Sequence, residues 1–322
     1  TYTYKGTAAT LAEMCPSCDA SLLNGAIAVA GGGINVGTYS MSSLGLTSTQ
    51  MGYNIKTGSG HLVITPAALT MTANNANKTY GQTVNFTGSE FTSSGLVNNE
   101  TISSVSLASA GSGATATVVG GPYVINASNA VGANGFLASN YNINYVGGLL
   151  TVNKANLTVS GLLANSKVYD GSTAATIDSS NVALAGLVNS DVIGVASSGV
   201  FADKNAGAGK LVALSNNYSG VALGNYNIID QAVSYAAITP KAVTLSGITA
   251  TDKTYDGSTA ATVSLSGASI SGLIAGDLIA LSSTGAFADK NAGSGKTVNL
   301  FNSFGGADAS NYSITNQVTT AA

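Results

Sequence analysis

Hydrophobic and polar residues alternate with a period of two in short runs along most of the chain. Residues 157–160, 182–184, 211–215 and 233–238 are examples. Alternation of this kind places successive side chains on opposite faces of a β-strand. No run of ten residues shows the period of about 3.6 that an amphipathic helix requires. The pattern therefore predicts short strands throughout.

Turn-forming residues separate these runs. Residues 170–171, 189–191, 205–207 and 224–225 combine Asp, Asn, Ser or Gly. Asp and Asn side chains bond to the local backbone, and Gly accepts positive φ. Short strands with turns every 8 to 12 residues or so are typical of antiparallel sheets packed as a sandwich or barrel. We expect an all-β fold: a tandem array of small antiparallel β-sandwich-like repeat domains.

The chain also repeats itself with a fixed period. Residues 169–176 return unchanged at 255–262, and residues 201–207 return at 287–293, in both cases 86 residues further on. A fixed period indicates copies of one unit in series. A catalytic site is normally built once, whereas a repeated unit supplies length, spacing or equivalent surfaces.

Weaker similarity extends the repeat towards the N-terminus. It predicts four units, at residues 1–66, 67–153, 154–239 and 240–322, of which the first is partial. The strands around Pro240 follow one another without a flexible Gly/Ser linker, so neighbouring units should sit end to end with limited bending. At about 30 Å per unit, four units would make a rod on the order of 120 Å. Each unit is expected to have its own small core.

Composition narrows the class of protein. Hydrophobic residues make up 45% of the chain and argue against disorder, while charged residues make up 8%, against a usual share of roughly 25%. No apolar run approaches the ~20 residues of a membrane helix. The eleven basic residues are all Lys and the net charge is −3, which argues against nucleic-acid binding. A surface of Ser, Thr, Asn and Gly is typical of extracellular β-proteins.

Cys15 and Cys18 form a C-x-x-C pair. The pair could be half of a zinc site, but no second pair exists and His61 is the only histidine. It could be a redox pair, although the surrounding βαβ pattern is missing. We favour a short disulfide that closes a loop, in keeping with an extracellular protein.

The repeated tyrosines and Asp-Gly pairs invite two interpretations. Tyr169 and Tyr255 could bind sugars, but we favour buried anchors whose hydroxyls reach backbone groups. The Asp-Gly pairs that follow them could bind calcium, but no second carboxylate stands close by in sequence, and we favour turns. The residues expected to have structural roles are Tyr169, Asp170, Gly171, Tyr226, Tyr255, Asp256, Gly257 and Tyr312.

Residues 203–205 and 289–291 read Asp-Lys-Asn. Lys, Asn and a nearby acid are the ingredients of a spontaneous isopeptide bond, which would suit a stalk under tension. Neighbouring residues on one strand point to opposite faces, so the reaction partners would have to come from elsewhere in the fold.

At the Tyr-Asp-Gly and Asp-Lys-Asn-Ala-Gly elements, the chain resembles the YDG repeats of large secreted bacterial adhesins. The unit at 67–153, with Lys78-Thr79-Tyr80-Gly81 in that place, resembles the companion MBG repeats, and residues 1–66 are similar to a partial MBG-like repeat. Both kinds occur in filamentous-haemagglutinin-like proteins exported by two-partner secretion.

This resemblance implies a structural stalk of a bacterial cell-surface adhesin or extracellular filament, such as those of biofilms, and no enzyme, cofactor or metal. The expected partners are neighbouring repeats of the same chain, with other copies in a fibre or cell-surface glycans as further candidates. Neither nucleic acid nor membrane insertion is expected. The alternative is an adhesive module that recognises carbohydrate or a like repeat on another cell.

Overall fold

The computed structural model describes residues 3–4, 7–8, 23–29, 35–48 and 60–322. These residues form β-strands, turns and three 3₁₀ turns, with no α-helix among them, which confirms the all-β fold class. The chain divides into two compact units, Thr1–Lys154 and Ala155–Ala322. Cys15 and Cys18 lie outside the described residues, so the disulfide stays a prediction. The 3₁₀ turns are Ala138–Asn140, Leu223–Asn225 and Ala309–Asn311.

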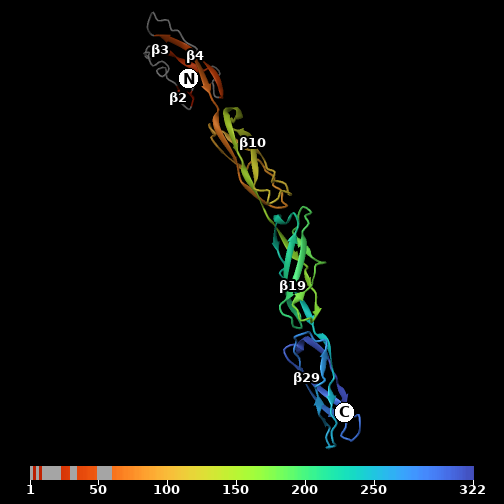
Figure 1. The fold of residues 1–322 in the computed structure, drawn as a ribbon. Coiled ribbons are helices and arrows are strands. Elements are labelled where there is room, and N and C mark those ends of the chain that lie inside the picture. The colour runs from red at the N-terminus through yellow and green to blue at the C-terminus, as the bar shows by residue number, and fades with distance from the viewer. Residues whose placement is uncertain (1–2, 5–6, 9–22, 30–34, 49–59) are drawn as a thin grey trace. The chain divides into compact units, whose positions relative to one another are not determined.

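Each group of paired strands comes from one continuous stretch of chain, as the narrow bands of colour in Figure 1 show. Near the N-terminus, three strands form an antiparallel sheet in the order β3-β4-β5, and two short strands pair as β1-β2. His61 lies on β5, in the strand that the alternation predicts. The bounds are β1 Thr3–Tyr4, β2 Thr7–Ala8, β3 Leu23–Val29, β4 Gly37–Ser48 and β5 Gly60–Ile64.

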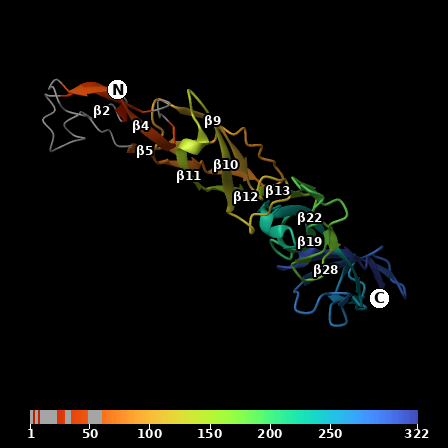
Figure 2. The ribbon, with the colours of Figure 1, turned by 90° about the horizontal axis from the view of Figure 1, so that it is seen from above.

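The second repeat comprises β6 to β12 and has two sheets, ordered β7-β12-β10-β9 and β11-β6-β8. β10 pairs with β9 on one side and β12 on the other (Figure 2). The bounds are β6 Ala67–Ala73, β7 Ala76–Thr79, β8 Phe91–Ser94, β9 Thr101–Ala108, β10 Tyr123–Ala133, β11 Tyr141–Val146 and β12 Gly148–Asn153.

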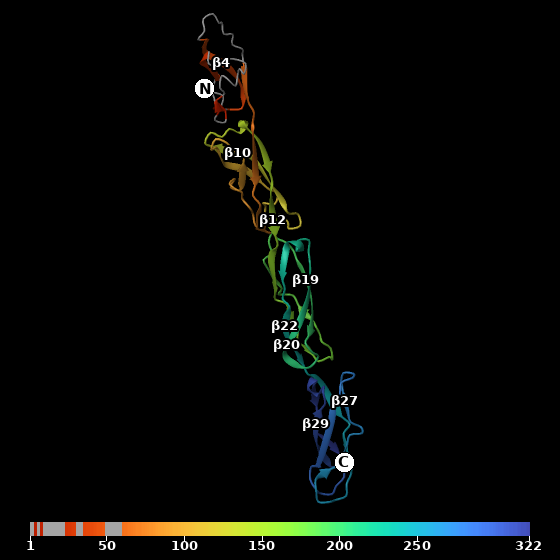
Figure 3. The ribbon, with the colours of Figure 1, turned by 90° about the vertical axis from the view of Figure 1, so that its left-hand side faces the viewer.

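The third repeat comprises β13 to β22. Its sheets have the orders β18-β13-β21, β14-β17 and β15-β22-β20-β19-β16, and the long strands of the last sheet lie side by side in Figure 3. The bounds are β13 Ala155–Ser160, β14 Leu163–Ala164, β15 Lys167–Val168, β16 Ala174–Ala175, β17 Ile177–Asp178, β18 Ala183–Ala185, β19 Gly194–Phe201, β20 Gly207–Ser219, β21 Tyr226–Ile229 and β22 Val233–Thr239.

The fourth repeat comprises β23 to β31 and follows the same plan, with sheets β27-β23-β30, β24-β26 and β25-β28-β29-β31. The bounds are β23 Lys241–Ser246, β24 Thr249–Ala250, β25 Ala260–Ala261, β26 Val263–Ser264, β27 Ser269–Ser271, β28 Ala280–Phe287, β29 Thr297–Gly305, β30 Tyr312–Thr315 and β31 Thr319–Ala321.

The alternation in sequence becomes alternation in burial. Along β13 and β12, every second residue is buried and the residues between are exposed. The sheets are not purely antiparallel, because the first strand of each of these three repeats runs parallel to a later one: β6 to β11, β13 to β21 and β23 to β30. Such pairs arise because the intervening chain crosses to the other sheet before it returns.

The cores are not fully separate, contrary to our expectation. The fourth repeat has a cluster of its own around Leu245, Ile248, Val298 and Leu300. A second cluster, around Tyr169, contains buried residues of both the third and the fourth repeat. The reason is that Tyr169 lies on the surface of the third repeat that faces the fourth repeat, and the fourth repeat covers it.

Candidate functional site

The contact surface between the third and fourth repeats, called the joint from here on, is centred on one carboxylate. Asp277 of the fourth repeat, whose side chain is 4% exposed, accepts a hydrogen bond from the hydroxyl of Tyr169 at 2.7 Å. Lys204 Nζ lies 3.0 Å from Asp277 Oδ1 and 3.4 Å from Asp308 Oδ1. Both donors belong to the third repeat, so an acid of one repeat is held by a tyrosine and a lysine of the other.

A lock within the fourth repeat fixes the position of Asp277. Tyr312, the first residue of β30, donates its hydroxyl to Asp277 Oδ2 at 2.6 Å. The same hydroxyl accepts a bond from the backbone N–H of Ile274 at 2.9 Å, and Asp277 N–H bonds to the Ile274 carbonyl at 3.1 Å. Contacts within the fourth repeat therefore help to fix the position of the carboxylate that the neighbouring repeat binds.

This lock recurs in the second and third repeats. The Tyr226 hydroxyl donates to Asp191 at 2.6 Å and accepts from Val188 N–H at 3.0 Å. In the second repeat, the Tyr141 hydroxyl donates to Glu100 at 2.6 Å. The tyrosines that the sequence marks at 226 and 312 thus hold the loop that carries the acid, and both are buried.

The charge states at the joint follow from these contacts. The hydrogen bond from Tyr312, with that from Tyr169, lowers the pKa of Asp277. Burial and the bond to Asp277 raise the pKa of Tyr312 to about 12. The hydrogen bond to Asp277 raises the pKa of Lys204. Near neutral pH the joint therefore holds an ionised Asp277, a protonated Lys204 and neutral tyrosines.

The same charges bear on the isopeptide hypothesis. Lys204 does find acids supplied from elsewhere in the fold, namely Asp277 and Asp308. Amide formation needs a neutral amine and a protonated acid, whereas here the pKa of Lys204 is raised and that of Asp277 is lowered. The pair is arranged as a salt bridge, and this geometry argues against the covalent bond.

Apolar packing surrounds the polar contacts. Tyr169 is 1% exposed, and its ring meets that of Tyr312 edge to face, with centroids 5.4 Å apart and an interplanar angle of 79°. Lys204 Nζ stands 5.9 Å from the centroid of the Tyr169 ring. An edge-to-face aromatic pair adds about 0.5–1.5 kcal/mol beyond the burial of its surface.

A second anchor at the joint is the side-chain amide of Asn311, which is fully buried. Its Oδ1 accepts the backbone N–H of Ala206 at 2.8 Å, and its Nδ2 donates to Asn205 Oδ1 at 3.2 Å. We call this two-bond contact the amide clasp. An amide presents one acceptor edge and one donor edge, so a single Asn satisfies two polar groups of the neighbouring repeat.

The amide clasp is also present in the N-terminal unit. Asn140 of the second repeat accepts the backbone N–H of Val36 at 2.9 Å and donates to Asn35 Oδ1 at 2.9 Å. Asn140 stands directly before Tyr141, as Asn311 stands before Tyr312. The same contact between adjacent repeats is thus present in both compact units.

The Asp-Gly pairs form turns. Asp170 Oδ1 accepts the N–H of Ser172 at 2.8 Å and pairs with Lys167 at 2.8 Å, and the hydrogen bond from Lys167 lowers the pKa of Asp170 to about 2. Gly171 has φ +77°, which favours glycine. Asp256 and Gly257 repeat this geometry, with Ser258 N–H at 2.9 Å and φ +77°.

Two expectations about the tyrosines were wrong. The Tyr169 hydroxyl reaches a carboxylate of the next repeat and not a backbone group. Tyr255, expected to be a buried anchor, is 61% exposed, because no repeat covers it in this structure. The eight residues that begin at Tyr255 are identical to those that begin at Tyr169, so this segment could not distinguish the two.

Sequence reasoning missed Asp277 and Asn311. Their signal was recurrence alone: Asp191 and Asn225 stand 86 residues earlier. Among the residues that the structure describes, no cluster of three or more His, Cys, Asp or Glu could hold a metal ion. No helix in that part of the chain is long and apolar enough to cross a membrane.

Comparison with known proteins was made at three levels. The YDG domain model matches residues 153–235 and 239–321, and the model of the MBG domain (YGX type) matches residues 69–151. No curated protein matches the chain. Among solved structures, Drosophila N-cadherin EC1-4 aligns over 79% of this chain and 74% of its own, at 9% identity and a TM-score of 0.21, which is too low to support an argument.

The two YDG matches together span just over half of the chain. They contain the Tyr-Asp-Gly turns and the residues of the joint, and the MBG match contains Glu100, Asn140 and Tyr141. The chain therefore belongs to the YDG domain family, as a tandem pair of YDG domains preceded by an MBG domain of the YGX type.

Proposed function

We propose that this chain is a structural segment of a bacterial cell-surface adhesin or extracellular filament, in which the repeats supply length and stiffness. The observation that carries this proposal is the joint between the third and fourth repeats. There Asp277, buried and ionised, is held by Tyr169 and Lys204 of the neighbouring repeat. Such an arrangement would transmit force from one repeat to the next.

Stiffness follows from the number of separate attachments. The Asp277 contacts are one, the amide clasp at Asn311 is a second, and the connection from β22 to β23 through Pro240 is a third. Pro240 fixes its own φ and restricts Thr239 to extended geometry. A bend about any one attachment would break another, so relative rotation of the two repeats is opposed.

The recurrence of the same contacts supports a structural role over a catalytic one. The tyrosine–acid lock is found in three repeats, and the amide clasp is found in both compact units. Arrays gain stability from equivalent interfaces between neighbours, whereas catalysis needs one constellation of unlike groups. The low charge and the surface of Ser, Thr, Asn and Gly fit an exported protein.

Stiffness at the joint can be measured with spin labels. After Cys15→Ser and Cys18→Ser, labels at the exposed, structurally equivalent positions Ser198→Cys and Thr284→Cys would report the distance between the third and fourth repeats. We expect a narrow distance distribution in the parent chain, and a broad one when Tyr169→Ala removes the ring from the joint.

The outcome that would contradict the proposal is a distribution in the parent chain as broad as that of the variant. In that case the repeats would be flexibly tethered, and the adhesive alternative would gain ground. A matched control is Tyr235→Ala, because Tyr235 is 62% exposed on β22 and its loss should leave the distribution narrow.

A further inference from the structure

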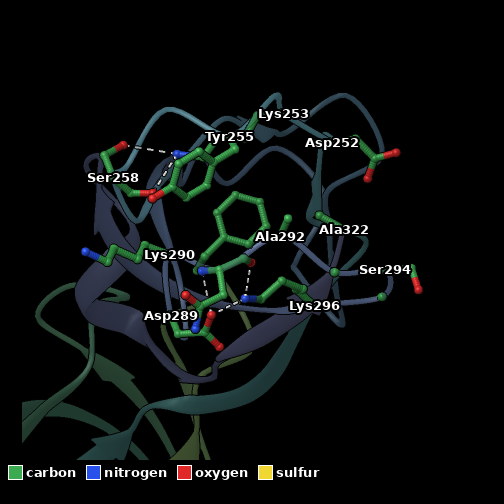
Figure 4. A pocket seen from close by; sticks show the side chains of 14 residues that line it. Asp252, Lys253, Tyr255, Ser258, Asp289, Lys290, Ala292, Ser294, Lys296 and Ala322 are labelled. Atoms are coloured by element: carbon green, nitrogen blue, oxygen red, sulfur yellow. Dashed lines mark hydrogen bonds and ion pairs between the residues drawn. The ribbon is translucent and has the colours of Figure 1, made fainter.

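The end face of the fourth repeat is exposed and hollowed. A cavity of about 400 Å³ is lined by Tyr255, Phe287, Asn291 and Ala292, among others, and we call this surface the end face. In Figure 4 the labelled side chains surround the hollow, and Lys290 extends away from the others. Tyr255 is 61% exposed here.

Each of these residues has a counterpart at the joint. Tyr255, Phe287, Lys290, Asn291 and Ala292 stand 86 residues after Tyr169, Phe201, Lys204, Asn205 and Ala206. In the third repeat, Tyr169 and Lys204 contact Asp277, while Asn205 and Ala206 contact Asn311. The end face therefore carries the counterparts of all four residues that make these polar contacts with the fourth repeat.

Several local contacts of the end face match those at the joint. Lys253 pairs with Asp256 at 2.9 Å, as Lys167 pairs with Asp170 at 2.8 Å. Lys253 Nζ stands 5.5 Å from the centroid of the Phe287 ring, against 5.6 Å for the Lys167 pair with Phe201. The backbone N–H of Asn291 bonds to Asp289 at 2.8 Å, the same distance as between Asn205 and Asp203. The turns that carry these residues therefore have the same local geometry in both repeats, and Lys290 would have to turn towards the incoming acid.

We propose that the end face is a docking site for a further repeat of YDG type. That repeat would supply an Asp in the position of Asp277 and an Asn in the position of Asn311. Lys290 is exposed and has no acidic partner in the described structure, so it is free to pair with the incoming acid. The proposal rests on the geometry of the joint and not on the stalk role.

The acid at position 308 further restricts which kind of repeat we expect the end face to bind. Lys204 lies 3.4 Å from Asp308 as well as close to Asp277. In the third repeat the residue corresponding to Asp308 is Ala222, and in the second it is Leu137. A repeat resembling the fourth therefore offers Lys290 two carboxylates, whereas one resembling the third offers one. The end face should select the former.

The test extends the full chain at Ala322 with a second copy of residues 237–322, in which Tyr255→Phe removes the duplicate tyrosine. Nitration by tetranitromethane, read by peptide mass spectrometry, would report the exposure of the remaining Tyr255. We expect its nitration rate to fall about tenfold towards that of Tyr169, which needs only a closed-to-open ratio of roughly ten to one. Lys290→Glu in the extended chain should restore reactivity, while Lys154→Glu, at another exposed lysine, should not.

Three results would overturn the proposal. The first is unchanged nitration of Tyr255 in the extended chain. The second is an appended copy that stays unfolded, seen as partial nitration of the normally buried Tyr312 peptide, because a repeat that docks is stabilised by docking. The third is protection of Tyr255 in the unextended chain as its concentration rises, which would make a second copy the occupant. None of these depends on the spin-label distances at the joint.

Discussion

Replacing Tyr169 and Tyr255 by alanine, one at a time, compares two tyrosines that begin identical eight-residue segments and lie in opposite environments. Tyr169 is 1% exposed, its ring packs on Tyr312, and its hydroxyl bonds to Asp277. Tyr255 is 61% exposed. A difference in the free energy of unfolding between the two variants therefore measures the tertiary environment, since the segment that each tyrosine begins is the same.

The magnitude follows from burial. Truncating a fully buried aromatic residue to alanine costs about 3–5 kcal/mol. The hydroxyl contributes on the order of 1–2 kcal/mol of this, because Asp277 keeps its bonds to Tyr312 and Lys204. We therefore expect Tyr169→Ala to cost about 4 kcal/mol and Tyr169→Phe about 1.5 kcal/mol. Tyr255→Ala should cost less than about 1 kcal/mol, in the range of surface substitutions.

Guanidinium unfolding of the full chain would give these free energies, and hydrogen exchange with mass spectrometry would locate the loss. Tyr169→Ala should speed exchange in both the third and the fourth repeat, because its ring belongs to a core cluster that contains residues of both. The second repeat should be unaffected. The reasoning would be refuted if Tyr255→Ala were as destabilising as Tyr169→Ala, or if the fourth repeat did not respond to Tyr169→Ala.

Three further predictions concern the joint. On the alkaline side, the pKa of Tyr312 is raised to about 12, so its contribution to stability is complete below its unfolded pKa of about 10 and is lost as pH rises towards 12; the melting temperature in that window should fall less steeply in Tyr312→Phe than in the parent chain. On the acid side, the pKa of Asp277 is lowered, so its contribution is present above its unfolded pKa of about 4 and is lost as pH falls further. Asp277→Asn should flatten this acid branch, and an unchanged slope would show that other carboxylates dominate. Finally, Asn311→Ala should cost about 1–3 kcal/mol by leaving the N–H of Ala206 unpaired, and Asn140→Ala should cost a similar amount in the N-terminal unit; both are measurable by chemical unfolding, and a neutral effect at either site would show that water replaces the amide.

Much of the fold could be predicted from the order of residues. The period of 86 residues, the alternation in β13 and the Asp-Gly turns at 170–171 and 256–257 are local properties, and each carries its own physical cause. The alternation follows from the two faces of a β-strand. A positive φ favours glycine because glycine has no Cβ, whatever residues lie nearby. These features determine strands, turns and copy number before any long-range contact forms.

The joint could not be predicted in the same way. Tyr169 and Asp277 are 108 residues apart, and nothing in the strand pattern shows that they meet. The same is true of Asn311 and Ala206, which lie in different repeats and meet only because the third and fourth repeats contact each other. Recurrence marked these residues as repeated, but their partners depend on how the repeats stack.

Residues 169–176 and 255–262 separate what the sequence determines from what the tertiary structure determines. The two octapeptides are identical and form the same turn, yet one tyrosine is buried and the other exposed. The turn is determined by short-range bonds within the octapeptide, so sequence alone determines it. Burial of the ring depends on which surface lies beyond the end of its repeat, and that surface is built from residues about a hundred positions away, so only the tertiary structure decides it.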